Sequence, residues 1–211
     1  MRPLLLFTGD SITEQGTDPT TDGWVTLLQS EYTRSADMVV RGLGGYNTRY
    51  DLVILFFTLL MGISFQGVVT VWFGANDAAL PNGSNVERHV PLALYTENLV
   101  QIVNKFQESV PALSILLITP PHIDDAVRQS YADQRSDNKR GLLDRSNTMA
   151  GSYAHACVEA ANRLGVPVLD LYTFFNAMSA STRNALLADG LHFNAQGNKL
   201  VRDQIRAKIK S

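Results

Sequence analysis

Short apolar runs alternate with longer amphipathic segments along most of the chain. Strands are predicted for the runs, because short stretches of apolar and β-branched residues between turn signals are typical of buried strands. Helices are predicted for the segments between them, in which apolar residues recur at helical spacings. The predicted strands are residues 3–7, 38–40, 68–73, 115–118 and 166–169, and the predicted helices are residues 23–32, 48–65, 95–109, 149–164 and 195–209.

This alternation predicts βαβ units, and therefore a parallel sheet with helices on both of its faces. In α/β sheets of this kind the ligand crevice lies beyond the carboxyl ends of the strands. Ser11, the Gly44-Gly45 turn, Asn76 and the loop from Pro120 each follow a predicted strand. We therefore expect these four features to meet at one edge of the sheet.

A serine near the start of the chain and a carboxylate–imidazole pair near its end indicate nucleophilic catalysis. Asp189 precedes His192 by three residues, which brings the two side chains together if the stretch forms a helical turn. A serine hydroxyl needs a base to take its proton, and the base needs a third group to orient it. The alternative for Ser11 is a helix N-cap. The alternative for the pair is a metal site, although no other His or Cys lies nearby in the sequence to complete it.

Two further motifs follow strand ends and suit a ligand site. The glycines of residues 42–48, Gly45 among them, permit positive φ and a close approach of backbone to a ligand, although a tight turn explains them equally well. Asn76 follows the third strand, and its amide can donate a hydrogen bond to an oxyanion. The alternative for Asn76 is a turn residue that hydrogen-bonds to its own backbone.

Two apolar stretches raise the question of a membrane segment. Residues 4–7 are fewer than the apolar region of an export signal contains, so we expect them to form the first core strand. Residues 52–65 hold eleven apolar residues of fourteen, and a span needs roughly twenty. We therefore expect a buried helix and no membrane span. The alternatives are an interface with lipid or with a second subunit, which would make the protein a homo-oligomer.

Charge and composition limit the remaining classes. Apolar residues make up 45% and charged residues 18% of the chain, which suits a single globular domain over residues 1–211. The net charge is −2 without a run of like charges, so no nucleic-acid partner is expected. Cys157 is the only cysteine, which excludes a disulfide within the chain and favours a cytoplasmic location. Ten charged residues of alternating sign lie from His122 to Arg145, and they predict a solvated surface that is also compatible with a lid.

Together these motifs resemble those of the SGNH hydrolases, also called GDSL lipases and esterases. The matching motifs are Gly9-Asp10-Ser11, the glycines of residues 42–48, Gly74-Ala75-Asn76-Asp77 and Asp189-Gly190-Leu191-His192, in that order. Residues 73–81, 89–92, 118–121 and 189–193 are similar to the isoamyl acetate-hydrolysing esterase branch. The resemblance runs from about Leu5 to Leu200, with Gly44 where this branch commonly has serine and His122 where it commonly has a third proline.

The resemblance implies an α/β fold, namely a three-layer α/β/α sandwich around a five-stranded parallel sheet of flavodoxin-like type, with no cofactor and no metal. It implies that Ser11 is the nucleophile, that His192 is the general base and that Asp189 orients the imidazole. The backbone N–H groups of Ser11 and Gly45 and the side-chain amide of Asn76 would then hold the oxyanion.

We therefore expect a serine esterase that hydrolyses small to medium acyl esters through an acyl-serine intermediate, with a small-molecule ester as its partner. A thioesterase or lysophospholipase using the same residues is an alternative. A non-catalytic binding protein on the same fold is another. The complete catalytic set argues against that last alternative, since an inactive relative would usually lack at least one member.

Overall fold

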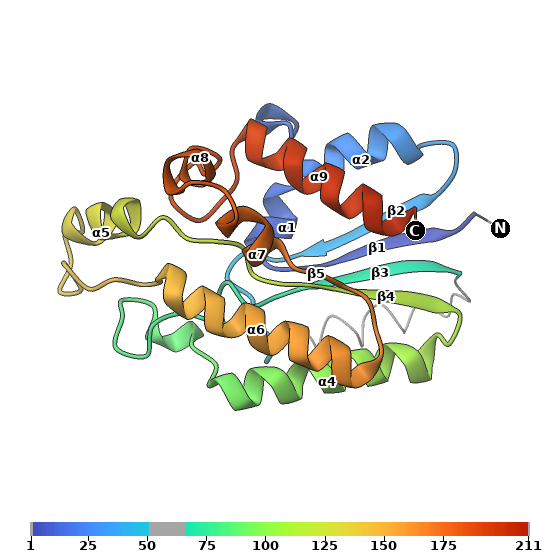
Figure 1. Ribbon diagram of the computed structural model, residues 1–211, viewed down its shortest axis with the longest axis horizontal. Helices are drawn as coiled ribbons and strands as arrows, with labels where there is room; N and C mark the ends of the chain where they lie inside the picture. The colour runs from blue at the N-terminus through green and yellow to red at the C-terminus, as the bar shows by residue number, and fades with distance from the viewer. Residues whose placement is uncertain (1, 51–65, 211) are drawn as a thin grey trace.

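A parallel sheet lies between two layers of helices in the computed structural model, which describes residues 2–50 and 66–210 (Figure 1). The predicted three-layer α/β/α sandwich with a five-stranded parallel sheet is confirmed. The strand order is β2-β1-β3-β4-β5. Strand β2 lies on one side of β1 and the later strands lie on the other, so the strand order reverses between β1 and β3. The strands are β1 (Leu4–Gly9), β2 (Asp37–Gly42), β3 (Gly67–Trp72), β4 (Leu113–Ile118) and β5 (Val168–Leu169).

Helices cover both faces of the sheet, and each layer encloses its own core cluster. Helices α1 (Ser11–Gln15), α2 (Trp24–Tyr32) and α9 (Ala195–Ile209) lie on one face, and α4 (Leu92–Ser109) and α6 (Asn147–Leu164) lie on the other (Figure 1). Strand β1 contributes to both clusters, because consecutive side chains of a strand point to opposite faces. The shorter elements are η1 (Pro19–Thr21), η2 (Val86–Arg88), α5 (Asp125–Asp133), α7 (Leu171–Asn176) and α8 (Ala180–Asn184).

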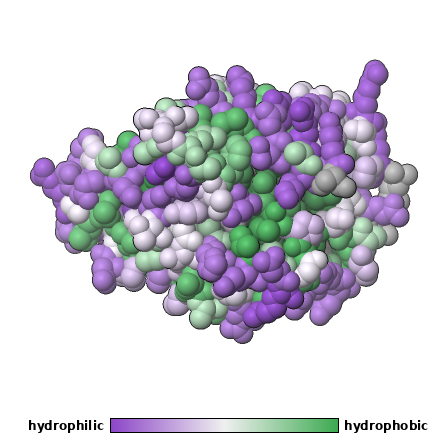
Figure 2. Space-filling model, in the orientation of Figure 1, coloured by the Kyte–Doolittle hydropathy of each residue, from purple (hydrophilic) through white to green (hydrophobic). Residues whose placement is uncertain are grey.

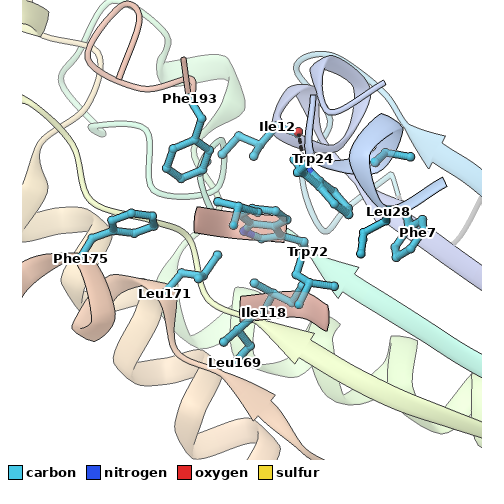
Figure 3. Close-up of a cluster of buried hydrophobic side chains, with 14 of the residues drawn as sticks. Phe7, Ile12, Trp24, Leu28, Trp72, Ile118, Leu169, Leu171, Phe175 and Phe193 are labelled. Carbon is cyan, nitrogen blue, oxygen red and sulfur yellow. Dashed lines mark hydrogen bonds between the residues drawn. The ribbon is translucent and has the colours of Figure 1, made fainter. Parts of the chain in front are cut away.

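Aromatic side chains from distant parts of the chain fill the cluster on the first face. Figure 3 shows Trp24 of α2 and Trp72 of β3 close together, with ring centroids 5.7 Å apart. Phe193 lies 6.4 Å from the Trp72 ring and 5.3 Å from that of Phe175. Each indole N–H has a carbonyl acceptor, that of Ile12 for Trp24 at 3.1 Å, so burying these rings leaves neither N–H unpaired. Because Phe193 follows His192 directly, this core anchors the loop that carries the imidazole.

Most predicted elements recur with ends shifted by a few residues, and the shifts have local causes. The last strand begins at Val168 instead of residue 166, because the Val166 N–H is bonded to the Ala161 carbonyl at 3.1 Å as part of the end of α6. Pro167 has no N–H to donate to a neighbouring strand. Residues 48–50 form a turn. The buried helix and the subunit interface predicted for residues 52–65 lie outside the described residues.

The surface in Figure 2 is hydrophilic over most of the face shown, and hydrophobic side chains gather between α6 and α9 near β5. Strand β5 is an edge of the sheet and only two residues long, which limits the unpaired backbone that an edge presents. No helix within residues 2–50 and 66–210 is long and apolar enough to cross a membrane. Cys157 is buried and unpaired.

Candidate active site

Three strand ends place the predicted site residues at one edge of the sheet. Gly9 at the end of β1 is in register with Gly42 of β2 on one side and with Trp72 of β3 on the other. Ser11, Gly45 and Asn76 follow these three residues within a few positions. They therefore meet where the strand order reverses, which is the usual position of a ligand crevice in such a sheet.

Ser11 is the first residue of α1, and its hydroxyl is free to interact with the imidazole. Asp10 is the N-cap of this helix, and its carboxylate accepts a hydrogen bond from the Ile12 N–H at 2.9 Å. The alternative role of Ser11 as the helix cap is therefore wrong, because Asp10 fills it. The Ser11 Oγ lies 2.9 Å from the His192 Nε2. That distance permits proton transfer from the hydroxyl to the ring.

Asp189 orients the imidazole from a tight loop. The His192 Nδ1 lies 2.8 Å from the Asp189 Oδ2, and the Asp189 Oδ1 accepts the backbone N–H groups of Leu191 and His192 at 3.0 and 2.8 Å. The two side chains come together without a helical turn, because Gly190 adopts a φ of +83° that a right-handed helix does not contain. Burial raises the pKa of Asp189, but the hydrogen bonds and charge of His192 outweigh it and hold that pKa well below its usual range.

Asn76 lies against the glycine turn, with both ends of its amide engaged. Its Nδ2 donates to the Tyr46 carbonyl at 2.8 Å, which brings the amide beside Gly45, whose φ is +81°. Among the residues described, no protein acceptor pairs with the second Nδ2 hydrogen or with the Gly45 N–H. Asn76 is therefore not the turn residue of the alternative reading, because its side chain bridges two strand ends.

Asp77 is hydrogen-bonded to Thr48, at the end of the glycine segment of residues 42–48. Its Oδ1 accepts the Thr48 N–H at 3.0 Å and the Thr48 hydroxyl at 2.5 Å. Burial raises the pKa of this carboxyl to about 6, against the opposing effect of the two Thr48 hydrogen bonds. The turn after β2 is thus fixed to the residues that follow β3.

Asp10 places a second buried carboxyl next to Ser11. Burial raises its pKa to about 7, although the Ile12 hydrogen bond and the charges of His192 and Arg145 lower it. Its Oδ2 is buried without a partner among the described residues. Asp10 is therefore largely uncharged below neutral pH, and it stands outside the hydrogen bonds that link Ser11 to Asp189.

Sequence reasoning missed the contribution of the charged segment to this site. Arg145 donates from Nη2 to the Asn76 Oδ1 at 2.6 Å and from Nε to the Ala75 carbonyl at 2.8 Å. The prediction of a solvated surface is wrong for Asp124, Arg128, Asp144 and Arg145, all of which are buried. Alternating charge cannot distinguish an exposed ion-pair surface from a buried ion-pair network, so no signal in the sequence singles these residues out.

A cavity of about 360 Å³ adjoins the glycine turn. Arg88 contributes to its wall and also approaches the Asn76 Oδ1 at 3.3 Å through Nη1. Among the described residues, no three His, Cys, Asp or Glu side chains lie together as a metal site would need. The residues that line the cavity are Gly44, Gly45, Tyr46, Asn47, Tyr50, Glu87 and Arg88.

Comparisons with known proteins relate the chain to esterases and lipases. The model of the GDSL-like lipase/acylhydrolase family matches residues 7–200. A GDSL esterase/lipase of Arabidopsis thaliana is 41% identical over 97% of this chain and 84% of its own length. The isoamyl acetate-hydrolyzing esterase 1 homolog of Mus musculus is 35% identical over 94% of this chain and 78% of its own. The crystal structure of a lipase/acylhydrolase from Enterococcus faecalis has a TM-score of 0.75 and 26% identity over 100% of this chain and 96% of that one.

Proposed function

Because the chain belongs to the GDSL-like lipase/acylhydrolase family and is a carboxylic ester hydrolase, we propose that it acts through an acyl-serine intermediate formed on Ser11. The observation that carries this proposal is the continuous set of hydrogen bonds from Ser11 through His192 to Asp189, at 2.9 and 2.8 Å. Such a set is the arrangement that activates a serine hydroxyl.

The first half of the reaction acylates the serine. The Ser11 Oγ attacks the ester carbonyl while the His192 Nε2 accepts the hydroxyl proton, and Asp189 stabilises the imidazolium that results. The carbonyl oxygen becomes an oxyanion held by the Gly45 N–H, the Ser11 N–H and the Asn76 amide. The C–O bond to the alcohol then breaks, and His192 donates its proton to the departing oxygen.

The second half releases the acid. Water gives a proton to the His192 Nε2 as its oxygen attacks the acyl carbonyl, and the same donors hold the second oxyanion. The Ser11 Oγ leaves and recovers its proton from the imidazolium. These steps need no cofactor, since each proton passes between Ser11, His192, the alcohol and water.

We propose small to medium acyl esters as substrates. The cavity beside the glycine turn has about 360 Å³, near the lower end of the range for small-molecule sites. The cavity adjoins Gly45, so it suits the acyl or the alcohol group of an ester whose carbonyl oxygen accepts the Gly45 N–H. A series of p-nitrophenyl esters from acetate to palmitate tests this assignment, and we expect kcat/KM to fall for the longest chains. A matched acetyl thioester measures whether thioesters serve as well.

The nucleophile is tested by covalent trapping. An organophosphonate should add once to the wild-type chain, and mass spectrometry of its peptides should place the adduct on Ser11. Ser11→Ala should lower kcat by about 10⁴-fold or more, while the exposed Ser30, changed to Ala as a matched control, should leave it unchanged. An adduct on another serine, together with an active Ser11→Ala variant, would refute the proposed function.

The base is tested against metal-assisted hydrolysis. His192→Ala should lose nearly as much activity as Ser11→Ala, because the two residues act as a unit. EDTA should leave the wild-type rate unchanged. Activity that is lost to the chelator and restored by zinc would show that the imidazole binds a metal instead.

A further inference from the structure

A buried ionic network runs from Asn76 to the loop of Asp189 and His192. Arg145 donates to the Asn76 Oδ1 at 2.6 Å and forms an ion pair with Asp144. Asp144 also pairs with Arg128, whose Nη2 and Nε lie 2.5 and 3.0 Å from its two oxygens. Arg128 in turn donates from Nη1 to the Asp189 carbonyl at 3.3 Å. The side chains of Arg128, Asp144 and Arg145 are 7%, 4% and 4% exposed.

We propose that Arg145 is a positioning residue that fixes the Asn76 amide with its nitrogen toward the reacting carbonyl. This inference rests on the proposed function, in which Asn76 donates to the oxyanion. A primary amide has a donor end and an acceptor end of nearly the same shape, so rotation by half a turn would exchange them. The reversed amide would present Oδ1 to a developing negative charge and would oppose the reaction.

The contacts of Arg145 suit this role better than those of its neighbour Arg88. Arg145 donates hydrogen bonds both to the Asn76 side chain and to the carbonyl of Ala75, the residue that precedes Asn76. Its third contact, with Asp144, fixes the guanidinium itself. Arg88 is only partly buried and reaches the same amide oxygen at 3.3 Å. A planar fork with several donors can make three such contacts at once, whereas a lysine ammonium on a flexible stem cannot reproduce them.

Stability alone does not account for a buried network of this kind. Two charges removed from water lose hydration that their attraction regains only in part, so a buried ion pair is weak evidence for stability. Two arginines share one aspartate here, so the three side chains together carry one net positive charge. That charge could also favour the oxyanion directly. A positional role and a direct electrostatic role make different predictions when Asn76 is removed.

A double-mutant cycle separates these roles. Arg145→Met should lower kcat on p-nitrophenyl acetate at least tenfold and change KM by less than about twofold. The same substitution made in Asn76→Ala should change kcat by less than about twofold, because no amide remains to position. Equal losses in both backgrounds would overturn the proposal in favour of a direct charge effect or a general structural effect. An Asn76→Ala variant with unchanged kcat would instead refute the oxyanion role of Asn76 on which this proposal rests, whereas the acyl-serine intermediate stands or falls with the trapping experiment on Ser11.

Two further variants complete the double-mutant cycle: one controls for the loss of a buried hydrogen bond, and the other replaces Arg145→Met if that variant does not fold. Tyr153→Phe removes another buried hydrogen bond, to the Val90 carbonyl, without contact with Asn76. It should lower the Tm and leave kcat unchanged. If Arg145→Met does not fold, Asp144→Asn keeps both Arg145 and Asn76 and loosens the guanidinium. It should lower kcat about threefold or more in the wild-type background and not in Asn76→Ala.

The orientation of the amide is also visible by NMR. The side-chain ¹⁵N–¹H signals of Asn76 are those missing from the spectrum of Asn76→Ala. They should shift in Arg145→Lys, which keeps the charge and loses the fork, and stay in place in Tyr153→Phe. Unchanged Asn76 signals in Arg145→Lys, together with unchanged kcat, would overturn the positioning role.

Discussion

Ser11 and Asn76 depend on neighbours that leave their reactive atoms free. Asp10 caps α1, so the Ser11 hydroxyl is available to His192. Arg145 occupies the oxygen of Asn76, so its nitrogen is available to Tyr46 and to a ligand. The positions of Ser11 and Asn76 could be predicted, because each follows a predicted strand within a motif that resembles the family's. Arg145 could not be predicted, because its proposed role acts through another residue and because it is one of the ten charged residues from His122 to Arg145.

Removal of the Asn76 amide should affect the chemical step more than binding. Asn76→Ala keeps Ser11 and His192 but removes a hydrogen bond made chiefly in the transition state. We expect kcat to fall about a hundredfold to a thousandfold with KM little changed. The exposed Asn82, changed to Ala, is the matched control. An increase in KM alone would show that Asn76 binds the substrate in its ground state.

Asp10 should make the folded state less stable as the pH rises. Its pKa is raised from 3.8 to about 7 by burial, so between these values the folded chain binds more protons than the unfolded chain does. The contribution of Asp10 to the free energy of unfolding therefore falls from about pH 4 to pH 7 and levels off above, by an amount on the order of 2–4 kcal/mol. Asp10→Asn keeps the cap and stays neutral, so it should unfold at a higher Tm than the wild type at pH 8 and at a similar Tm at pH 4.

The control for this measurement is another capping aspartate. Asp18 caps η1 in a half-buried position, and the hydrogen bonds of Thr20 lower its pKa. Asp18→Asn should therefore leave the fall between pH 4 and pH 7 in place. The same fall in Asp10→Asn as in the wild type would contradict the effect assigned to Asp10.

Strands such as β1 were easier to predict than short helices such as α5. A strand that is buried on both faces consists of apolar residues, whereas a short helix at the surface buries few of its residues. Strand β1 is buried on both faces and reads as one apolar run. Helix α5 buries Arg128 and exposes Val127 and Tyr131, so its apolar residues do not mark its buried face. The segment that contains α5 packs on the loop of Asp189 and His192, since the Asp124 N–H donates to the Gly190 carbonyl at 3.0 Å. Only tertiary partners make such a helix recognisable.

This packing makes Gly190 sensitive to a single methyl group. A Cβ at Gly190 would lie 3.1 Å from Val127 and 3.2 Å from Arg128, at a φ of +83°. We expect Gly190→Ala to lower the Tm by several degrees, because alanine is strained at this φ. It should also lower kcat by about tenfold or more, because Asp189 and His192 lie within two residues of the substituted position. Gly165→Ala has a similar φ of +66° with nothing within 4 Å. It should lower the Tm by a smaller amount and leave kcat unchanged, and equal kcat in the two variants would contradict the argument.

The two core clusters share one sheet, so we propose that the chain unfolds as a single domain. Trp24 and Trp72 report on one face of the sheet, and Tyr95 and Tyr153, with ring centroids 5.0 Å apart, report on the other. In urea, tryptophan fluorescence, near-ultraviolet tyrosine signals and far-ultraviolet circular dichroism should give one coincident transition. A tryptophan transition at a lower urea concentration than the others would show two separable units.

The distance along the chain between Ser11 and its base, 181 residues, has a consequence for the newborn protein. Ribosomes deliver the serine first, and at roughly 5–20 residues per second the imidazole follows only ~10–40 s later. Throughout that interval the hydroxyl has no base and is an ordinary alcohol. Under the proposed mechanism the growing polypeptide therefore cannot attack cellular esters or acylate itself, and hydrolysis begins only when translation has nearly finished.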